Sequence, residues 1–166
     1  MSEVSIRRGR AGDVVPLNDL YNHYIRETAI TFDLEPMPLA RREDWFAQFG
    51  ESGRHQLFVA ERGGRLVGYA CSRPFRDKAA YDTTAETSIY LAPEACRQGI
   101  GRRLYARLFD ELAGADLHRL VAGITLPNEA SVALHERAGF QPLGVFREVG
   151  RKFGRYWDVL WMERGL

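Results

Sequence analysis

Apolar residues recur along the whole chain in two spacings, one typical of strands and one typical of helices. Short apolar or alternating runs predict seven strands, at about residues 4–8, 56–61, 66–72, 84–91, 119–124, 140–147 and 156–164. Apolar residues at helical spacing, as in Ile100, Leu104 and Leu108, predict four helices, at about residues 12–27, 39–49, 99–113 and 128–138. The pair Gly63-Gly64 tolerates the positive φ of a primed turn and predicts a hairpin between the second and third strands. The order of the elements indicates an α/β (α+β) protein.

Length and composition indicate one soluble globular domain over residues 1–166. The 166 residues contain no Pro/Gly/Ser-rich linker and no repeat, and 45% of them are apolar and 27% charged. The net charge of +1 disfavours a nucleic-acid-binding protein, which usually carries a concentrated basic excess.

The cysteines and the N-terminal residues bear on the compartment. Cys71 and Cys96 offer neither a disulfide framework nor the paired spacing of metal ligands, so we expect a reducing environment and no metal site. Residues 1–10 lack the apolar core of a signal peptide, and no later run approaches the roughly 20 apolar residues of a membrane span. We therefore expect a cytoplasmic protein that does not enter a membrane.

Residues 94–104 join an expected strand to an expected helix through a basic turn that contains Gly99 and Gly101. Backbone N–H groups at a helix N-terminus lack intrahelical acceptors and carry the positive end of the helix dipole, and glycines let an anion approach the main chain closely. The turn therefore suits a pyrophosphate, and a solvated surface turn is the simpler alternative. A dinucleotide fingerprint would need a third glycine and a P-loop would need Gly-Lys-Ser/Thr, and this turn has neither.

Three motifs together resemble the GCN5-related N-acetyltransferase (GNAT) family. They are the Gln-Gly-Ile-Gly turn at 98–101, the Asn128-x-x-Ser131 start of the next helix, and the helix exit into Gly139-Phe140. A narrower resemblance, to the phosphinothricin and methionine sulfoximine acetyltransferase branch, is carried by residues 21–24, 28–32, 80–82, 86–90, 126–128, 134–136 and 149–155. The resemblance implies a mixed, splayed central sheet, acetyl-CoA as cosubstrate, a small-molecule amine as acceptor, and a homodimer.

The resemblance also implies which residues bind acetyl-CoA. The turn would receive the pyrophosphate through Arg97, Gln98, Gly99, Ile100, Gly101 and Arg102. The preceding strand would contact the pantetheine arm through the main chain of Ile89, Tyr90 and Leu91. Asn128 is a preferred helix N-cap, and the resemblance adds a hydrogen bond to a pantetheine amide. Cys96 stands where the family usually has Gln or Arg, so we expect weakened but retained pyrophosphate binding.

Acetyl transfer to an amine needs a base, because an alkylammonium is mostly charged near neutral pH. Strand alternation puts Glu86 on the same face as Ser88 and Tyr90, and the resemblance makes Glu86 the base; a solvated strand carboxylate is the alternative. Histidine can donate a proton near neutral pH, so His135 is a candidate acid or orienting group for the departing sulfur, with a structural helix histidine as the rival.

Basic and aromatic residues indicate the acceptor site. Guanidinium groups pair with carboxylates or phosphinates, and an aromatic wall suits a short aliphatic chain. The candidates in the loop that precedes the strand of Glu86 are Arg73, Phe75, Arg76, Lys78 and Tyr81. The branch resemblance implies that Phe32 and Lys152, from other segments, lie near them. In the alternative interpretation, several of these charges merely solvate a loop. Our leading hypothesis is an N-acetyltransferase for the α-amine of amino-acid analogues such as phosphinothricin, methionine sulfoximine or methionine sulfone, with direct attack of the amine on the thioester. The alternatives are another amine acceptor (polyamine, aminoglycoside or protein) and an acyl-CoA-binding module without turnover.

Overall fold

The computed structural model describes residues 3–166, which form one seven-stranded sheet with the order β1-β2-β3-β4-β5-β7-β6. The strands are β1 (Val4–Arg8), β2 (Leu57–Arg62), β3 (Arg65–Pro74), β4 (Thr84–Leu91), β5 (Arg119–Thr125), β6 (Gln141–Lys152) and β7 (Arg155–Gly165). The α-helices of these residues are α1 (Val14–Glu27), α2 (Leu39–Phe46), α3 (Ile100–Leu112) and α4 (Glu129–Arg137). The expected mixed α/β fold and the expected order of elements are confirmed.

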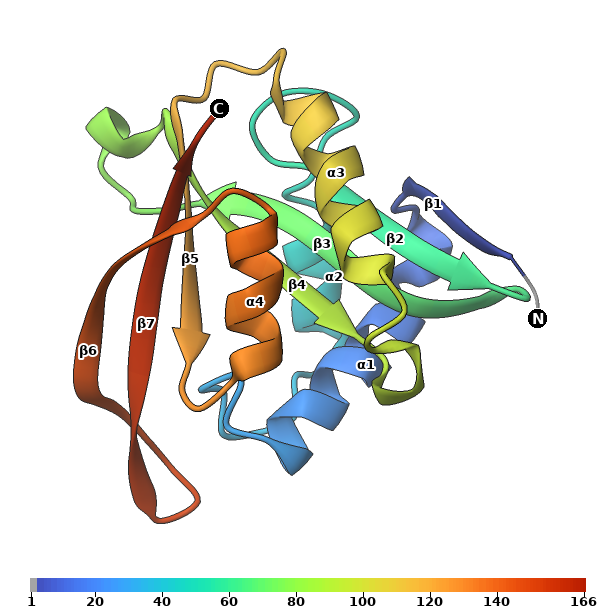
Figure 1. Cartoon of the computed structure of the whole chain (residues 1–166). Coiled ribbons are helices and arrows are strands. Elements are labelled where there is room, and N and C mark those ends of the chain that lie inside the picture. The colour runs from blue at the N-terminus through green and yellow to red at the C-terminus, as the bar shows by residue number, and fades with distance from the viewer. Residues whose placement is uncertain (1–2) are drawn as a thin grey trace.

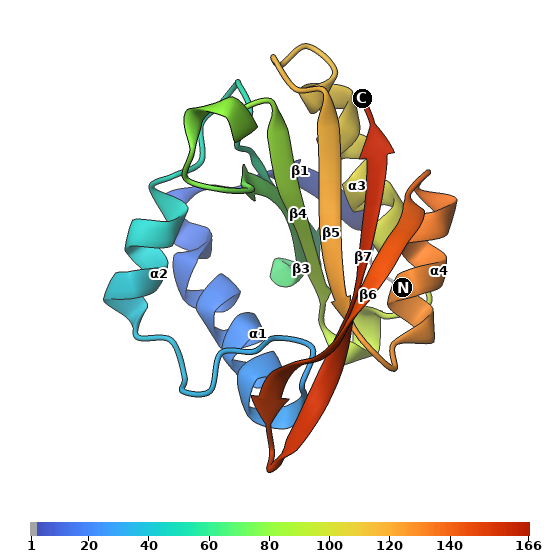
Figure 2. The ribbon, with the colours of Figure 1, turned by 90° about the vertical axis from the view of Figure 1, so that its left-hand side faces the viewer.

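The helices cover the sheet on both faces. Helices α1 and α2 pack on one face, and α3 and α4 pack on the other (Figures 1 and 2). Alternate residues of β2 enter different cores: Phe58 faces α3, whereas Leu57 and Val59 join Leu17 of α1 and Trp45 of α2. Period-two alternation thus gives each face of the sheet its own apolar layer.

Some elements end at residues other than those expected from the apolar pattern. Strand β3 continues to Pro74, because Arg73 and Pro74 pair with Glu86 and Ala85 of β4. Strand β6 extends to Lys152, because its exposed outer half pairs with β7 in a long hairpin. Cross-strand pairing, which the apolar pattern does not record, sets these ends.

Strands β4 and β5 are parallel neighbours over a short stretch and then diverge (Figure 1). Pairing covers Thr84–Glu86 of β4 and Arg119–Val121 of β5. Beyond Glu86, the edge of β4 that faces β5 has no strand partner among the described residues. The sheet is therefore splayed, as expected, and main-chain groups of β4 are left open to a ligand. No helix within residues 3–166 combines the length and the apolarity that crossing a bilayer would require.

Candidate active site

A cavity of about 880 Å³ lies where β4 leaves β5. Its walls are the end of β4, the turn before α3 and one face of α4. Ile89, Tyr90 and Leu91 all line it, as expected for the strand that would contact an extended cofactor arm.

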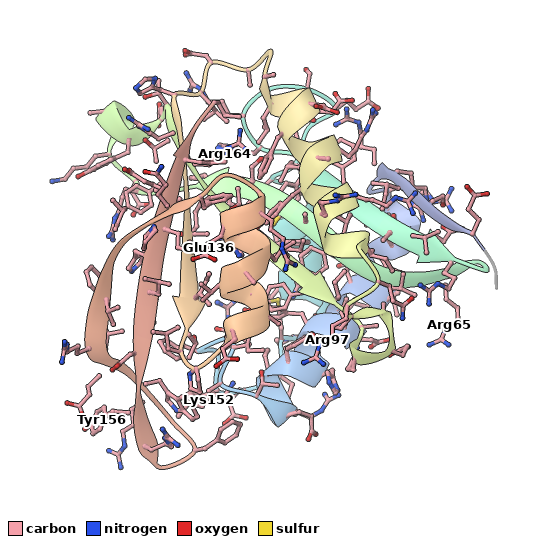
Figure 3. All side chains as sticks on the ribbon, viewed as in Figure 1. Arg65, Arg97, Glu136, Lys152, Tyr156 and Arg164 are labelled. Atoms are coloured by element: carbon pink, nitrogen blue, oxygen red, sulfur yellow. The ribbon has the colours of Figure 1, made fainter. Side chains whose placement is uncertain are left out.

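The turn before α3 presents its main chain to this cavity. Arg97 has a φ of +60° and Gly99 a φ of +76°, so two left-handed residues bracket Gln98 just before the first turn of α3. Such a turn directs consecutive N–H groups to one side, and the positive end of the helix dipole lies behind them. Figure 3 shows Arg97 at this end of α3. The geometry is that of an anion-binding nest.

The expected members of the nest separate into two groups. Arg97, Gly99, Ile100, Gly101 and Arg102 line the cavity. Gln98 is not among the lining residues, since its side chain accepts a hydrogen bond from Arg62 and donates to the main-chain oxygen of Glu94 (2.7 Å). The cation Arg62 lies 36 residues away in sequence, and local spacing could not reveal this contact.

Helix α4 forms the opposite wall and contributes residues that sequence reasoning missed. Ala130, Ala133, Leu134 and Arg137 line the cavity, and their spacing places them on one helix face. That spacing was the available signal. A β-carbon on Gly101 would come within 3.0 Å of the Leu134 side chain, so glycine permits the close approach of α3 and α4.

Asn128 has the N-cap role that its sequence position predicts. Its Oδ1 accepts a hydrogen bond from the backbone N–H of Ser131 (3.2 Å). The residue also lines the cavity, where its Nδ2 is available as a donor to a ligand.

A second cavity of about 490 Å³ adjoins the first and contains Glu86; we call it the reaction cavity. Tyr90, Asn128 and Ser131 belong to the walls of both cavities. Glu86 is half-buried and lies directly across from Arg73 of β3, so the two side chains share a face. Burial raises the pKa of Glu86, and the charges of Arg73 and Arg76 offset part of that rise. A carboxylate of raised pKa in a cleft is suited to accept a proton near neutral pH.

His135 lines the same cavity but uses both ring nitrogens within the protein. It is 3% exposed, and its Nδ1 donates to the main-chain oxygen of Ser131 (2.7 Å). The tautomer that this bond fixes leaves Nε2 to accept a hydrogen bond from the Tyr105 hydroxyl (2.7 Å). Burial lowers the pKa of His135, although the bond to Ser131 acts in the opposite sense. The imidazole is therefore held neutral and fixed in orientation.

Of the residues expected at the acceptor site, some line the cavity that contains Glu86 and others do not. Phe32, Arg73 and Arg76 line the cavity that contains Glu86. Lys152 does not: it is 4% exposed and its Nζ donates to the main-chain oxygen of Thr31 (2.8 Å), which ties the β6–β7 hairpin to the 28–33 segment (Figure 3). Phe75, Lys78 and Tyr81 are also absent from its walls; Phe75 and Tyr81 instead pack edge to face in the loop that follows β3.

Sequence reasoning missed other residues around Glu86. Tyr21 and Thr31 of the N-terminal segments and Ser88 of β4 line the cavity, and so do Phe146, Val159 and Trp161 of the β6–β7 hairpin. The alternation of β4 gave the signal for Ser88.

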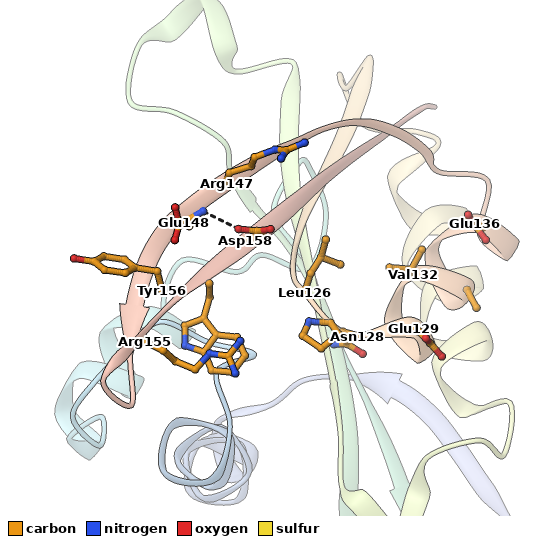
Figure 4. A pocket seen from close by; sticks show the side chains of 13 residues that line it. Leu126, Asn128, Glu129, Val132, Glu136, Arg147, Glu148, Arg155, Tyr156 and Asp158 are labelled. Atoms are coloured by element: carbon orange, nitrogen blue, oxygen red, sulfur yellow. Dashed lines mark hydrogen bonds between the residues drawn. The ribbon is translucent and has the colours of Figure 1, made fainter.

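A separate groove of about 790 Å³ lies between α4 and the β6–β7 hairpin (Figure 4). Glu129 and Glu136 line it from α4, and Arg147, Tyr156 and Asp158 line it from the hairpin. The groove touches the other two cavities at Asn128, but neither Glu86 nor His135 lines it. Within residues 3–166, no cluster of three or more His, Cys, Asp or Glu side chains is placed to hold a metal ion.

Comparison with known proteins identifies a family and several relatives that this chain resembles. The family model described as "Acetyltransferase (GNAT) family" matches residues 17–140. A phosphinothricin N-acetyltransferase of Streptomyces coelicolor is 54% identical over 167 residues, which cover 99% of this chain and 98% of that protein. An L-methionine sulfoximine/L-methionine sulfone acetyltransferase of Pseudomonas paraeruginosa is 32% identical, with 98% of this chain and 94% of that protein covered.

Solved structures agree with the sequence comparison. The crystal structure of a GNAT superfamily phosphinothricin acetyltransferase from Sinorhizobium meliloti in complex with acetyl-CoA superposes with a TM-score of 0.93. It is 30% identical, and the match covers 100% of this chain and 89% of that one. The splayed sheet, the nest before α3 and the extent of these matches lead to one conclusion: the chain belongs to the GNAT acetyltransferase family and is an N-acetyltransferase.

Proposed function

We propose that the protein transfers acetyl from acetyl-CoA to the α-amine of a small amino-acid analogue of the phosphinothricin, methionine sulfoximine or methionine sulfone type. The observation that carries the proposal is the placement of half-buried Glu86 beside two arginines in a cavity that adjoins the nest. Relatives named for phosphinothricin and for methionine sulfoximine support the acceptor class.

The nest and the splayed edge of β4 fit acetyl-CoA. The turn supplies backbone donors for a pyrophosphate, and Arg97, Arg102 and Arg137 add positive charge around the same cavity. The open main-chain edge of β4 at Ile89, with Asn128 opposite, suits the amides of a pantetheine arm. The main-chain oxygen of Leu91 is not available, because it accepts a hydrogen bond from the Tyr24 hydroxyl. When bound there, acetyl-CoA would supply an acetyl group activated as a thioester.

Glu86 is the proposed general base. An acceptor ammonium in the 490 Å³ cavity would give one proton to the Glu86 carboxylate, directly or through a water, and become a nucleophilic amine. The amine nitrogen then forms a bond to the acetyl carbon, the carbon–sulfur bond breaks, and the sulfur leaves with the electron pair and takes up a proton. Arg73 and Arg76 would hold the acceptor's carboxylate near Glu86, because both arginines are close enough to Glu86 for their charges to affect its pKa.

His135 is the proposed orienting group. Its Nε2 accepts a hydrogen bond from the Tyr105 hydroxyl of α3 and its Nδ1 donates to Ser131 within α4, so the ring joins the last turn of α4 to α3. A neutral imidazole with both ring nitrogens engaged in hydrogen bonds has no free proton to donate to sulfur. We favour this role over that of a general acid.

A cationic acceptor is the less suitable alternative. Polyamines and aminoglycosides favour an acidic site, whereas Arg73 and Arg76 line the wall beside Glu86. A binding module without turnover would not need a carboxylate of raised pKa in the cavity.

We also propose that the protein acts as a homodimer through the β6–β7 hairpin. This hairpin exposes a series of large apolar side chains, namely Leu143, Val145, Phe146, Val149, Phe153 and Tyr156. Strand β6 is the outer strand of the sheet, so its free edge is open to pairing. Light scattering of the purified protein should give twice the mass of the 18.9 kDa chain, and a monomer at micromolar concentration would contradict the proposal.

Thiol release from acetyl-CoA tests the proposed activity. The acceptors are phosphinothricin, methionine sulfoximine, methionine sulfone, spermidine and an aminoglycoside, assayed side by side. Selective turnover of the three amino-acid analogues is the expected result. Turnover of the cationic amines alone would overturn the proposed acceptor class.

A further inference from the structure

A third cavity, of about 360 Å³, extends from the reaction cavity toward α2. It shares Tyr21, Arg73, Ser88 and Tyr90 with the cavity that contains Glu86, but Glu86 does not line it. The two cavities therefore meet at Arg73, and the third one lies beyond the position where the amine would react.

The wall of this third cavity contains a buried arginine without a counter-ion. Arg42 is 1% exposed, and none of residues 3–166 forms an ion pair with it. Its guanidinium carbon lies 4.5 Å from the ring centre of Tyr21 and 4.3 Å from that of Trp45, so two aromatic faces hold the group in place.

Most donors of Arg42 are unused. Its Nε has one long hydrogen bond, 3.4 Å to Oδ1 of Asn18, and its buried Nη2 has no hydrogen-bond partner among the described residues. A guanidinium has five N–H donors, and leaving a buried charged donor unpaired is costly. An apolar side chain of similar volume would fill the same space at lower cost. The unused donors therefore call for an acceptor in the cavity.

The carboxylates nearby do not meet this need. Asp33 lines the cavity, but its Oδ2 accepts from the Tyr21 hydroxyl at 2.7 Å. Asp44 lines the cavity as well and forms no ion pair with Arg42. The donors of Arg42 are thus free for a ligand that carries its own oxygen atoms.

We propose that Arg42 determines acceptor specificity by binding the oxygen-bearing end of the acceptor's side chain. The inference rests on the proposed function. With the α-amine at Glu86 and the carboxylate at Arg73 and Arg76, the side chain points past Arg73 into the third cavity. A tetrahedral phosphinate, sulfoximine or sulfone presents oxygen atoms that match the guanidinium donors.

Methionine sulfone and methionine form a matched acceptor pair, because they differ only in two side-chain oxygens. The experiment measures kcat/KM for both acceptors in the wild type, in Arg42→Met, in Arg42→Lys and in Arg26→Met. Arg26 is an exposed arginine of α1 that lines none of the three cavities, so its variant is the matched control.

The wild type should favour the sulfone, and Arg42→Met should reduce that preference by about 10- to 100-fold, the effect of losing hydrogen bonds to a charged group. Arg42→Lys should lose part of the preference, since lysine keeps the charge but not the planar fork. The KM for acetyl-CoA should stay unchanged in every variant, and Arg26→Met should behave as the wild type.

Two results would overturn the role of Arg42 alone. One is a wild type that turns over both acceptors with equal kcat/KM. The other is an Arg42→Met protein in which both kcat/KM values fall equally, which a purely structural role predicts. Should Arg42→Met not fold, the wild-type preference and Arg42→Lys still decide the question. Absence of wild-type turnover with every amino-acid analogue would instead refute the proposed function, and the role of Arg42 with it.

Discussion

The contact between Phe32 and Gly150 allows the reaction cavity to be disturbed by a substitution outside its walls. A β-carbon built on Gly150 would lie 2.2 Å from Cε2 of Phe32, whereas ordinary contacts begin at 3.4 Å. Phe32 lines the reaction cavity, and Gly150 lies on β6, outside its walls. The φ of Gly150 is not positive, so alanine meets no backbone strain there. Gly150→Ala should therefore act through the Phe32 ring.

The magnitude follows from the overlap. The ring must retreat by more than 1 Å to restore ordinary contact. A displacement of about 1 Å in a substrate-positioning group can cost up to 10²-fold in rate, so we expect kcat/KM for the acceptor to fall by about 10- to 100-fold. This loss equals about 1.4–2.7 kcal/mol of transition-state stabilisation.

Steady-state kinetics with each substrate varied in turn measures the effect. The KM for acetyl-CoA should not change, because neither residue lines the cofactor cavity. Gly144→Ala is the matched control: it lies on the same strand, and a β-carbon there would meet nothing within 4 Å. In a Phe32→Ala background, Gly150→Ala should have little further effect, since the clashing ring is gone.

An unchanged acceptor kcat/KM in Gly150→Ala would refute the placement of Phe32 in the acceptor site. Equal losses in Gly150→Ala and Gly144→Ala would show that the hairpin responds to any added side chain. Additive losses in the double variant would show that Gly150 acts without Phe32.

Glu86→Gln should lower kcat by about 10²- to 10⁴-fold without changing the KM for acetyl-CoA. Because burial raises the pKa of Glu86, the wild-type activity should begin to fall at a pH above the ordinary carboxyl range as the pH is lowered. An acidic limb of the pH profile that persists in the variant would contradict the base assignment. Gly99→Ala places a β-carbon at a φ of +76°, at a cost of about 1–2 kcal/mol, so the KM for acetyl-CoA should rise while that for the acceptor stays constant; an unchanged cofactor KM would count against the nest. Tyr105→Phe leaves His135 Nε2 without its donor and should lower the free energy of unfolding by about 1–3 kcal/mol with kcat nearly constant, whereas a large loss of kcat at constant stability would assign the pair to proton transfer. Burial raises the pKa of Asp13, but the hydrogen bonds from Arg7 and from the Arg10 backbone N–H, together with the charges of both arginines, outweigh this effect and hold the pKa below its usual 3.8. Asp13→Asn should therefore be less stable than the wild type by about 1–3 kcal/mol at pH 7. Urea unfolding should show this difference shrinking as the pH falls below 3.8, and equal stabilities at pH 7 would contradict it.

The sequence predicted most elements because their apolar periodicity matches the two faces of the sheet. The pattern Ile100, Leu104, Leu108 and Leu112 marks the buried face of α3, and all four side chains are buried in the structure. The long outer half of β6 escaped prediction for the opposite reason. Its residues are largely exposed and carry no core signal, so pairing with β7 alone defines them as a strand.

Side-chain assignments were predictable where the local backbone decides them and not where a distant residue does. Strand alternation predicts Glu86 and Ser88 on one face, and the burial of β4 agrees, since Ala85 and Thr87 are buried whereas Glu86 and Ser88 are half-buried. Both Glu86 and Ser88 line the reaction cavity. Gln98 and Lys152 do not line the cavities expected for them, because they form hydrogen bonds with Arg62 and Thr31, which lie 36 and 121 residues away in sequence. Arg42 was missed because an arginine on a short helix is normally exposed, and its burial depends on Tyr21 and Trp45.

The position of Glu86 connects the architecture to the proposed chemistry. It is the last residue of β4 that pairs with β5, so the main chain on its N-terminal side is held by both neighbours and the main chain beyond it is free on one edge. A base at this position is rigidly anchored and stands where the edge of β4 opens for a cofactor arm. Moving the end of the β4–β5 pairing by one residue would put a residue from the opposite face of β4 at the point of divergence. We infer that the length of the parallel pairing, which the sequence does not display, determines which side chain can serve as the base.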